Sequence, residues 1–340
     1  MDKRPLVSFC ITCYNQERYI VDTLNAALKQ TYRPLEIVIS DDCSSDGTNE
    51  VIQSHVEMYR KNGGDIPIVY NRNLKNLGNL GNWLLFGGLA HGELLVKADG
   101  DDYSLPERCT KIVEAWTRNG RRAKCISHRA IGFDRRLRSL GLIGSTKPGM
   151  NWGCCCAYTP DCWRFFDDNT SFNHDAIDDV VFSRRVRLFD EEGSRAELVI
   201  PDILVYYRLG AGITTNSRSH RMTQLVAWKA MINSRKNLLA DLNSAKGRVS
   251  QKSFSIIEGE IHSGVELAEK YVQLLSSEKF KQRLAAFRAI KVEGFSSFLR
   301  HLIYLLPRGI GDVLLNTKER LARCVQIVRN GQKLDIKSHE

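Results

Sequence analysis

Residues 94–102 read Leu-Leu-Val-Lys-Ala-Asp-Gly-Asp-Asp, a short apolar run that ends in a cluster of carboxylates. The run predicts a strand over Leu94–Ala98, because strands covered on both faces are mostly apolar. The acids follow at the point where this strand ends. In sheets of parallel strands, ligands bind outside the carboxyl ends of the strands. The stretch therefore predicts a covered parallel sheet with a polar site at one edge.

The same alternation continues on both sides of this stretch. Further apolar runs predict strands at Leu6–Thr12, Leu35–Ser40, Ile66–Tyr70 and Cys125–Ile131. Amphipathic stretches predict the helices between them, at residues 20–28, 48–59, 81–90 and from Pro106 onward. This order indicates an α/β fold with a mainly parallel sheet and helices on both faces.

The pattern is less regular from residue 132 to residue 221. A helix is predicted at Ile177–Leu188, strands at Leu198–Pro201 and Leu204–Arg208, and a loop at Gly210–Arg221. From Met222 the pattern is helical to the end of the sequence. We therefore expect an α/β part followed by a mostly helical C-terminal region over residues 222–340.

The composition is that of a globular protein, with 43% hydrophobic and 26% charged residues among 340. Ten cysteines are too sparse for a disulfide scaffold. The sequence runs directly into a predicted strand and contains no apolar run of about 18 residues, so neither a signal peptide nor a membrane-spanning helix is expected. We expect a cytoplasmic protein.

The cysteines do not predict a metal site. Cys10 and Cys13 fall on one predicted strand, where residues three apart point to opposite faces. The run over residues 154–156 is three adjacent cysteines, which cannot converge on one ion, so we expect them to pack as small apolar side chains.

The net charge of +10 belongs mainly to the C-terminal part, where residues 281–329 hold ten Lys or Arg and three acids. An apolar helical stripe runs through the same region, from Phe295 to Leu306. Such a helix either packs on the rest of the protein or lies on an anionic membrane surface, and the charge excess favours weak peripheral association with the inner face of the cell membrane. Nucleic acid is not expected as a partner, because basic and aromatic residues do not interleave.

The acids at 99–102 suit a divalent cation. Asp99, Asp101 and Asp102 would repel one another without a counter-charge, and their oxygens are the ligands that Mg²⁺ or Mn²⁺ prefers. A cation that also holds two phosphates neutralises a departing diphosphate. Asp42, after the second strand, can accept a hydrogen bond from a uracil imide or a ribose hydroxyl. The alternatives are a solvated acidic turn at 99–102 and a turn with a helix cap after Asp42.

Four stretches together resemble glycosyltransferase family 2, which has the GT-A fold. They run from Pro5 to Asn15, from Glu36 to Thr48, from Asn76 to Gly78 and from Lys97 to Arg108. The resemblance implies a catalytic domain over residues 1–221, with a nucleotide-binding half (1–131) and an acceptor half that carries the catalytic base (132–221). It implies an inverting enzyme that moves a sugar from a UDP-hexose or UDP-N-acetylhexosamine to a hydroxyl of a carbohydrate or lipid-linked acceptor. The pathway implied is the synthesis of surface polysaccharide, O-antigen or capsule.

The resemblance also implies roles for single residues. Asp101 would ligate the metal, with Asp102 beside it, and Asp179 aligns with the catalytic base. A base of this kind contributes roughly 10²–10⁴-fold to the rate. The nucleotide would contact Thr12, Tyr14, Asp42, Asn76 and Asp99. Asp178 and Asp179 also suit a helix N-terminus, where negative charge is favourable.

One departure from the family concerns the metal. Many relatives carry histidine two residues after a Tyr-Arg pair, whereas here Arg208 is followed by Leu209 and Gly210. Either His220 substitutes for it, or the metal is held by Asp101, diphosphate and water. Arg208 is a candidate clamp for the diphosphate. Trp152 falls where the family builds its acceptor platform, with core packing as the alternative reading.

The sequence gives less support to other functional classes. The first strand is not followed by the Gly-x-Gly-x-x-Gly turn of a dinucleotide oxidoreductase, and no Walker loop is present. Two alternatives stay open: a sugar nucleotidyltransferase, which shares metal-binding acids and cleaves at phosphorus, and a non-catalytic module that binds a nucleotide-sugar.

Overall fold

The computed structural model describes residues 4–134, 136–144, 148, 153–163, 176–191, 194–210, 220–247, 249–290, 301–306 and 314. In chain order the elements are β1 (Val7–Cys13), α1 (Ile20–Leu28), β2 (Leu35–Asp41), α2 (Thr48–Lys61), β3 (Ile68–Arg72), α3 (Gly78–Leu84), α4 (Phe86–Leu89), β4 (Leu94–Asp99), β5 (Tyr103–Ser104), α5 (Arg108–Arg118), β6 (Cys125–Phe133), β7 (Ser139–Ile143), the 3₁₀ turn η1 (Gly153–Cys155), β8 (Cys156–Tyr158), the 3₁₀ turn η2 (Pro160–Cys162), α6 (Asp178–Arg187), β9 (Glu197–Arg208), α7 (His220–Ala245), α8 (Gln251–Ser276) and α9 (Phe280–Ala289).

One sheet organises the α/β part, with strand order β3-β2-β1-β4-β8-β6-β9-β5 and β7 paired to β6. The strands β3, β2, β1 and β4 pair in parallel, which confirms the predicted parallel sheet for the first half of the fold. In the second half, β8 pairs antiparallel with both β4 and β6, while β6 and β9 are parallel. The α/β class predicted from the sequence is therefore confirmed, with a mixed second half.

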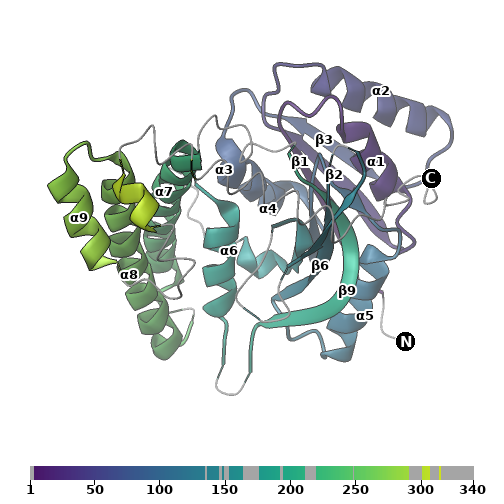
Figure 1. The fold of residues 1–340 in the computed structure, drawn as a ribbon. Coiled ribbons are helices and arrows are strands. Elements are labelled where there is room, and N and C mark those ends of the chain that lie inside the picture. The colour runs from purple at the N-terminus through teal and green to yellow at the C-terminus, as the bar shows by residue number, and fades with distance from the viewer. Residues whose placement is uncertain are drawn as a thin grey trace.

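Helices cover both faces of this sheet, as Figure 1 shows. On one face, Phe9 and Ile11 of β1 pack in a core with side chains of α1, α2 and α5. On the other face, Cys10 of β1 packs in a core with α3, α4 and α6. Cys13 belongs to the first core and Cys10 to the second, so the two cysteines point to opposite faces as predicted.

Several predicted boundaries were wrong, including the strand predicted at Ile66–Tyr70, which is β3 at Ile68–Arg72. The helix expected at 81–90 is two helices, α3 and α4, joined at Leu85. The two strands expected on either side of residue 202 are the single strand β9, which contains Pro201. The pairing of β9 with β6 shifts register twice near Arg129, and such a bulge accommodates a proline inside a strand. The helix expected to start at Pro106 begins at Arg108.

The C-terminal region is helical where it is described, as predicted. Helix α7 packs against α6 and α8, and Leu238 and Leu242 of α7 share a core with Phe182 of α6. Side chains before and after residue 221, where the catalytic domain was expected to end, therefore share one hydrophobic core. Within the described residues, none of the helices is long and apolar enough to cross a membrane. Of the apolar stripe at 295–306, the part before residue 301 lies outside the described residues.

Candidate active site

The carboxyl ends of β1, β2 and β4 lie side by side because these three strands pair in parallel. Thr12 of β1 is in register with Ser40 of β2 and with Asp99 of β4. Its hydroxyl donates a hydrogen bond of 3.4 Å to an Asp99 oxygen, and its carbonyl accepts from the N–H of Gly100 at 2.8 Å. The fold thus brings Thr12 and Asp99 together with Asp42, whose N–H donates to the carbonyl of Cys13 at 2.9 Å.

Asp42 fixes the start of α3. Its carboxylate is buried and accepts hydrogen bonds from the backbone N–H groups of Leu77 at 2.8 Å and Gly78 at 2.9 Å, and from the side-chain amide of Asn73 at 2.8 Å. The Asn76 side chain also accepts from Gly78, at 3.0 Å. The cap expected from the sequence after Asp42 concerns the helix at 48–59, where Asp46 accepts from the N–H of Thr48 at 3.0 Å, whereas Asp42 itself caps α3. Asn76 is thereby held next to Asp42, while Tyr14 stands on the loop after β1 with 36% of its surface exposed.

The acidic turn after β4 is buried and short of counter-charge. Burial, and then the charge of Asp99, raise the pKa of Asp101 to about 7. Burial, and then Asp101 and Asp99, also raise the pKa of Asp102 well above its usual value. One Asp102 oxygen accepts from the N–H of Arg208 at 2.9 Å, and its other oxygen is buried without a hydrogen-bond partner. An unpaired buried carboxylate oxygen next to a second carboxylate fits a cation.

The protein ligands for such a cation are few. Among the described residues, no group of three or more His, Cys, Asp or Glu side chains could hold a metal ion. A hard cation such as Mg²⁺ can take one or two carboxylates and complete its shell with phosphate oxygens and water, and the Asp101 and Asp102 carboxylates are ligands of that type. His220 begins α7, and its side chain lies outside the described residues, as does Trp152.

Arg208 braces the acidic turn from behind. Its Nε donates to the carbonyl of Asp101 at 2.9 Å, and its Nη2 donates to a carboxylate oxygen of Asp22 at 2.9 Å. The guanidinium also lies over the rings of Tyr19 and Phe133, 4.7 Å from each centroid. These contacts leave it 9% exposed, which favours a role in holding the turn over the predicted role as a diphosphate clamp.

The predicted base stands at the first turn of α6, facing β4. The Lys97 ammonium pairs with an Asp178 oxygen and lies 3.6 Å from an Asp179 oxygen. The Asp178 side chain is 6% exposed and the Asp179 side chain 33%, so Asp179 is the carboxylate that a second molecule can reach. Burial, and then Asp178, raise the pKa of Asp179 to about 7, against the opposing effect of Lys97. A carboxylate with a pKa near neutral pH is suited to general-base catalysis.

The predicted base and the acidic turn lie close enough for their charges to interact. Burial raises the pKa of Asp99, Lys97 lowers it, and Asp178 raises it, so Asp99 senses the charges at both places. Sequence reasoning gave Lys97 no role. The sequence feature that could have pointed to Lys97 is a lysine within an otherwise apolar strand, because a buried ammonium must find a partner.

A buried arginine links β4, which carries Lys97, to the η1 turn beside it. Arg108 is fully buried and donates to the carbonyl of Lys97 at 2.7 Å and to that of Cys154 at 2.6 Å. It also bonds Ser104 and His128, so it ties together β4, β5, β6 and η1. The cysteines of 154–156 are buried in the cores on either side, which confirms that they pack as small apolar side chains.

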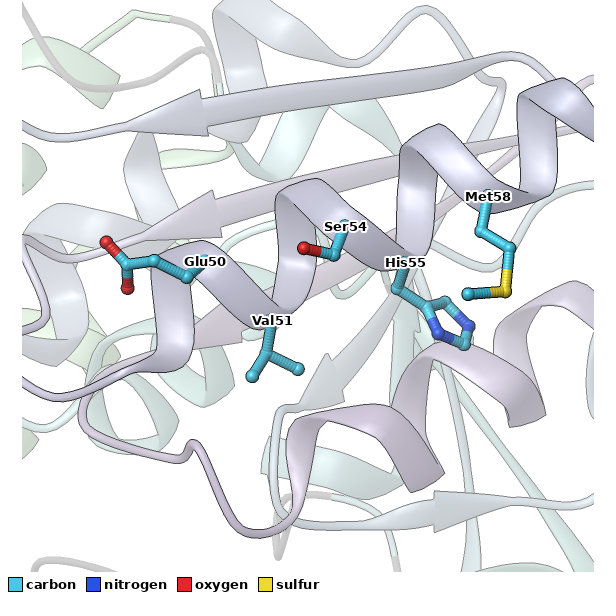
Figure 2. A pocket seen from close by; sticks show the side chains of 5 residues that line it. All are labelled: Glu50, Val51, Ser54, His55 and Met58. Carbon is cyan, nitrogen blue, oxygen red and sulfur yellow. The ribbon is translucent and has the colours of Figure 1, made fainter.

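A surface hollow elsewhere has no part in this site. Figure 2 shows its five lining side chains, all from α2: Glu50, Val51, Ser54, His55 and Met58. None of them belongs to the strand ends or to the first turn of α6. The chemistry of the described residues therefore points to the carboxyl ends of β1, β2 and β4.

Comparisons with known proteins identify the family of this chain. Residues 8–180 match the model of a family described as glycosyl transferase family 2. An uncharacterized glycosyltransferase of Haemophilus influenzae is 27% identical over 240 residues, covering 66% of this chain and 72% of the relative. A putative glycosyltransferase of Bacillus subtilis, EpsE, is 30% identical over 152 residues, 44% of this chain and 52% of the relative. Abequosyltransferase RfbV of Salmonella typhimurium is 40% identical over 99 residues, 28% of each chain.

Two solved structures share the fold. S. aureus TarS in complex with UDP-GlcNAc is 18% identical with a TM-score of 0.51, covering 85% of this chain and 93% of that one. A mannosyltransferase from Pyrobaculum calidifontis in complex with GDP-Man and Mn²⁺ is also 18% identical, with a TM-score of 0.54 over 94% of this chain and 81% of that one. At this identity the likeness establishes the fold and leaves the substrates of this chain to its own residues.

Proposed function

The chain belongs to glycosyl transferase family 2, and from this premise we propose that it moves a sugar from a nucleotide-sugar to a hydroxyl group of a carbohydrate or lipid-linked acceptor. The observation that carries the proposal is the meeting of two groups at one sheet edge. One is the buried acidic turn with Asp101 and Asp102, which has few positive charges near it, and the other is the accessible carboxylate of Asp179. The first suits a leaving diphosphate and the second suits an attacking hydroxyl.

The donor would lie across the ends of β1, β2 and β4. Thr12, Asp42 and Asp99 are held there by the hydrogen bonds of the strand ends, with Asn76 beside Asp42 and Tyr14 on the adjoining loop. We propose a UDP-hexose or UDP-N-acetylhexosamine as the donor. The complex of S. aureus TarS with UDP-GlcNAc supports this choice, and the GDP-Man complex of the mannosyltransferase makes GDP the nucleotide to test against it.

We propose Mg²⁺ or Mn²⁺ as the cofactor. Asp101 would hold it, with Asp102 beside it through the oxygen that lacks a hydrogen-bond partner. Such a cation would neutralise negative charge on the departing diphosphate. Arg208 keeps the turn in place for this purpose, because its Nε donates to the carbonyl of Asp101 and its backbone N–H donates to a carboxylate oxygen of Asp102.

Asp179 would act on the acceptor. It removes the proton of the acceptor hydroxyl as that oxygen forms a bond to the anomeric carbon, and the bond from this carbon to the diphosphate oxygen breaks on the opposite side. The configuration at the anomeric carbon is then inverted, and the diphosphate leaves with the bonding electrons. Surface polysaccharide is the acceptor class we propose. Relatives named abequosyltransferase and teichuronic acid biosynthesis glycosyltransferase support it.

The experiment is a donor and acceptor screen on the full chain. UDP-, GDP- and TDP-sugars are incubated with Mn²⁺ and a set of oligosaccharides, and free nucleoside diphosphate and elongated acceptor are measured together. Equal amounts of both products support transfer, with Asp179→Asn as the control that should form neither. Sugar 1-phosphate formed only on addition of pyrophosphate would instead indicate a nucleotidyltransferase. Donor binding without any product would indicate a binding module.

A further inference from the structure

We propose that Lys97 is a positioning residue for the transfer reaction: by pairing with Asp178, it holds Asp179 in place as the free, ionised carboxylate that accepts the proton. This inference rests on the proposed function, because it takes Asp179 to be the base. It concerns a residue of β4 that the sequence patterns left without a role.

The surroundings of Lys97 are those of a built ion pair. Its side chain is 3% exposed, and its ammonium lies 4.6 Å from the centroid of the Trp83 ring and against the Asp178 carboxylate. Burial works to lower the pKa of Lys97, but Asp178, Asp99 and Asp179 outweigh it and hold this pKa well above its usual value. Lys97 is therefore a permanent cation at any pH at which the enzyme works.

The two neighbouring acids divide their tasks. Asp178 is the more buried and is in contact with the ammonium, whereas Asp179 keeps a third of its side chain exposed at 3.6 Å from the same ammonium. In the described part of the chain, the ionisable groups that face Asp179 are Asp178 on α6, Lys97 and Asp99 on β4, and Tyr158 on β8. Burial raises the pKa of Tyr158 well above its usual value, so this phenol is neutral. Lys97 therefore supplies a positive charge that faces both carboxylates of the first turn of α6.

Gly153 leaves the space in which this arrangement fits. A Cβ atom at this position would collide with the Lys97 ammonium and with an Asp179 oxygen. Arg108 fixes the backbone on either side of the pair, since it binds the carbonyls of Lys97 and Cys154. The ammonium and the two carboxylates are thus confined between β4, η1 and the first turn of α6, which is how a positioning residue is held.

Two substitutions should shift the pKa of Asp179 in opposite directions. An opposite charge within about 4–6 Å lowers the pKa of a carboxylate by about 1–3 units, and a like charge raises it. Lys97→Met removes the cation, so Asp179 takes up its proton at higher pH. Asp178→Asn removes the like charge and leaves Lys97 to Asp179 alone, so Asp179 loses its proton at lower pH. The base works only when ionised, so the acidic limb of the rate profile follows these shifts.

The test is the pH dependence of kcat/KM for the wild type, Lys97→Met, Lys97→Arg and Asp178→Asn, with the melting temperature of each recorded over the same pH range. We expect the acidic limb to move up by about 1 unit or more in Lys97→Met, to move down in Asp178→Asn, and to stay near the wild-type position in Lys97→Arg. A purely structural role would lower the rate of Lys97→Met at every pH and leave the limb in place.

The outcomes separate this inference from the proposed function. If the wild type forms no elongated acceptor with any donor, the proposed function fails. If the wild type transfers sugar and the limb of a folded Lys97→Met stays at the wild-type position, the role of Lys97 is refuted while the function stands. Should Lys97→Met fail to fold, Lys97→Gln takes its place, because its amide can still donate to Asp178 while the positive charge is gone: its acidic limb should move up, and an unmoved limb would refute the role of Lys97.

Discussion

Replacing Asp241 should destabilise the protein far more than replacing Glu260, although both acids bind arginines of α6. Arg185 and Asp241 have fully buried side chains, with 3.0 Å between Nε and a carboxylate oxygen. Burial lowers the pKa of Arg185 to about 10, so it remains charged at neutral pH. Asp241→Ala leaves that guanidinium buried without this carboxylate, and breaking such a pair costs about 3–5 kcal/mol.

The matched control lies two residues further along α6. Arg187 binds Glu260 of α8 through two hydrogen bonds, of 2.5 and 2.9 Å, with side chains that are 26% and 40% exposed. Partly exposed pairs of this kind contribute about 0–1 kcal/mol, so Glu260→Ala should shift the stability little. Both variants lose one carboxylate that joins α6 to a C-terminal helix, and they differ in burial.

The assay is equilibrium unfolding in urea, monitored by tryptophan fluorescence, with the double variant Arg185→Met and Asp241→Leu as a third protein. Replacing both buried charges with apolar groups is often neutral, so the double variant should recover most of the loss. Equal losses in Asp241→Ala and Glu260→Ala would refute the reasoning from burial. A double variant as unstable as Asp241→Ala would show that lost packing, and not the uncompensated charge, is the cause.

Three further predictions concern catalysis and location. Asp179→Asn should retain donor binding, measured by calorimetry, and lose transfer; transfer by this variant would place the base elsewhere. The kcat/KM of the wild type should decrease as the pH is lowered below 7, because the pKa of Asp179 is about 7 and its protonated form cannot accept a proton. Asp101→Ala should abolish the gain in UDP affinity that Mn²⁺ provides, and a retained gain would remove Asp101 as the ligand. The full chain should sediment with anionic vesicles and not with neutral ones, and reversing Lys318, Arg320 and Arg323 to Glu should weaken this, since each basic residue near such a surface contributes about 1 kcal/mol; equal sedimentation with both vesicles would end the membrane proposal.

The sequence predicts the first half of the fold well, for a local reason. Strands β1, β2, β3 and β4 are short apolar runs followed by polar residues, and parallel pairing needs no more information than their alternation with helices. The second half depends on pairings between distant segments. Strands β5 and β8 hold two and three residues, too few to show any periodicity, and the antiparallel pairing of β8 with β4 and β6 leaves no local signal.

The same distinction holds for the site. The acids after β2 and β4 were predictable because each follows its own strand. The contacts of Lys97 and Arg208 were not, because their partners are not recognisable from the sequence alone: Asp178 for Lys97, and Asp22 and Asp101 for Arg208. An isolated arginine suggests a phosphate ligand, and only the fold reveals that the Nε and Nη2 of Arg208 already donate to a carbonyl and a carboxylate.

The Arg185–Asp241 pair also bears on catalysis, because α6 carries Asp179 at its start. Six residues of helix place Arg185 about 9 Å further along the axis. The start of α6 is held by the Lys97–Asp178 pair and by a 2.6 Å hydrogen bond from the N–H of Ile177 to Ser234 of α7. Helix α7 thus contacts α6 near both of its ends, through Ser234 and Asp241. A misplacement of about 1 Å in a catalytic group can lower the rate about 10²-fold. Under conditions where it is still folded, Asp241→Asn should therefore lose turnover while donor binding persists, and Glu260→Gln should keep both. Unchanged turnover in Asp241→Asn would mean that the contacts at the start of α6 position the base without help from the buried pair.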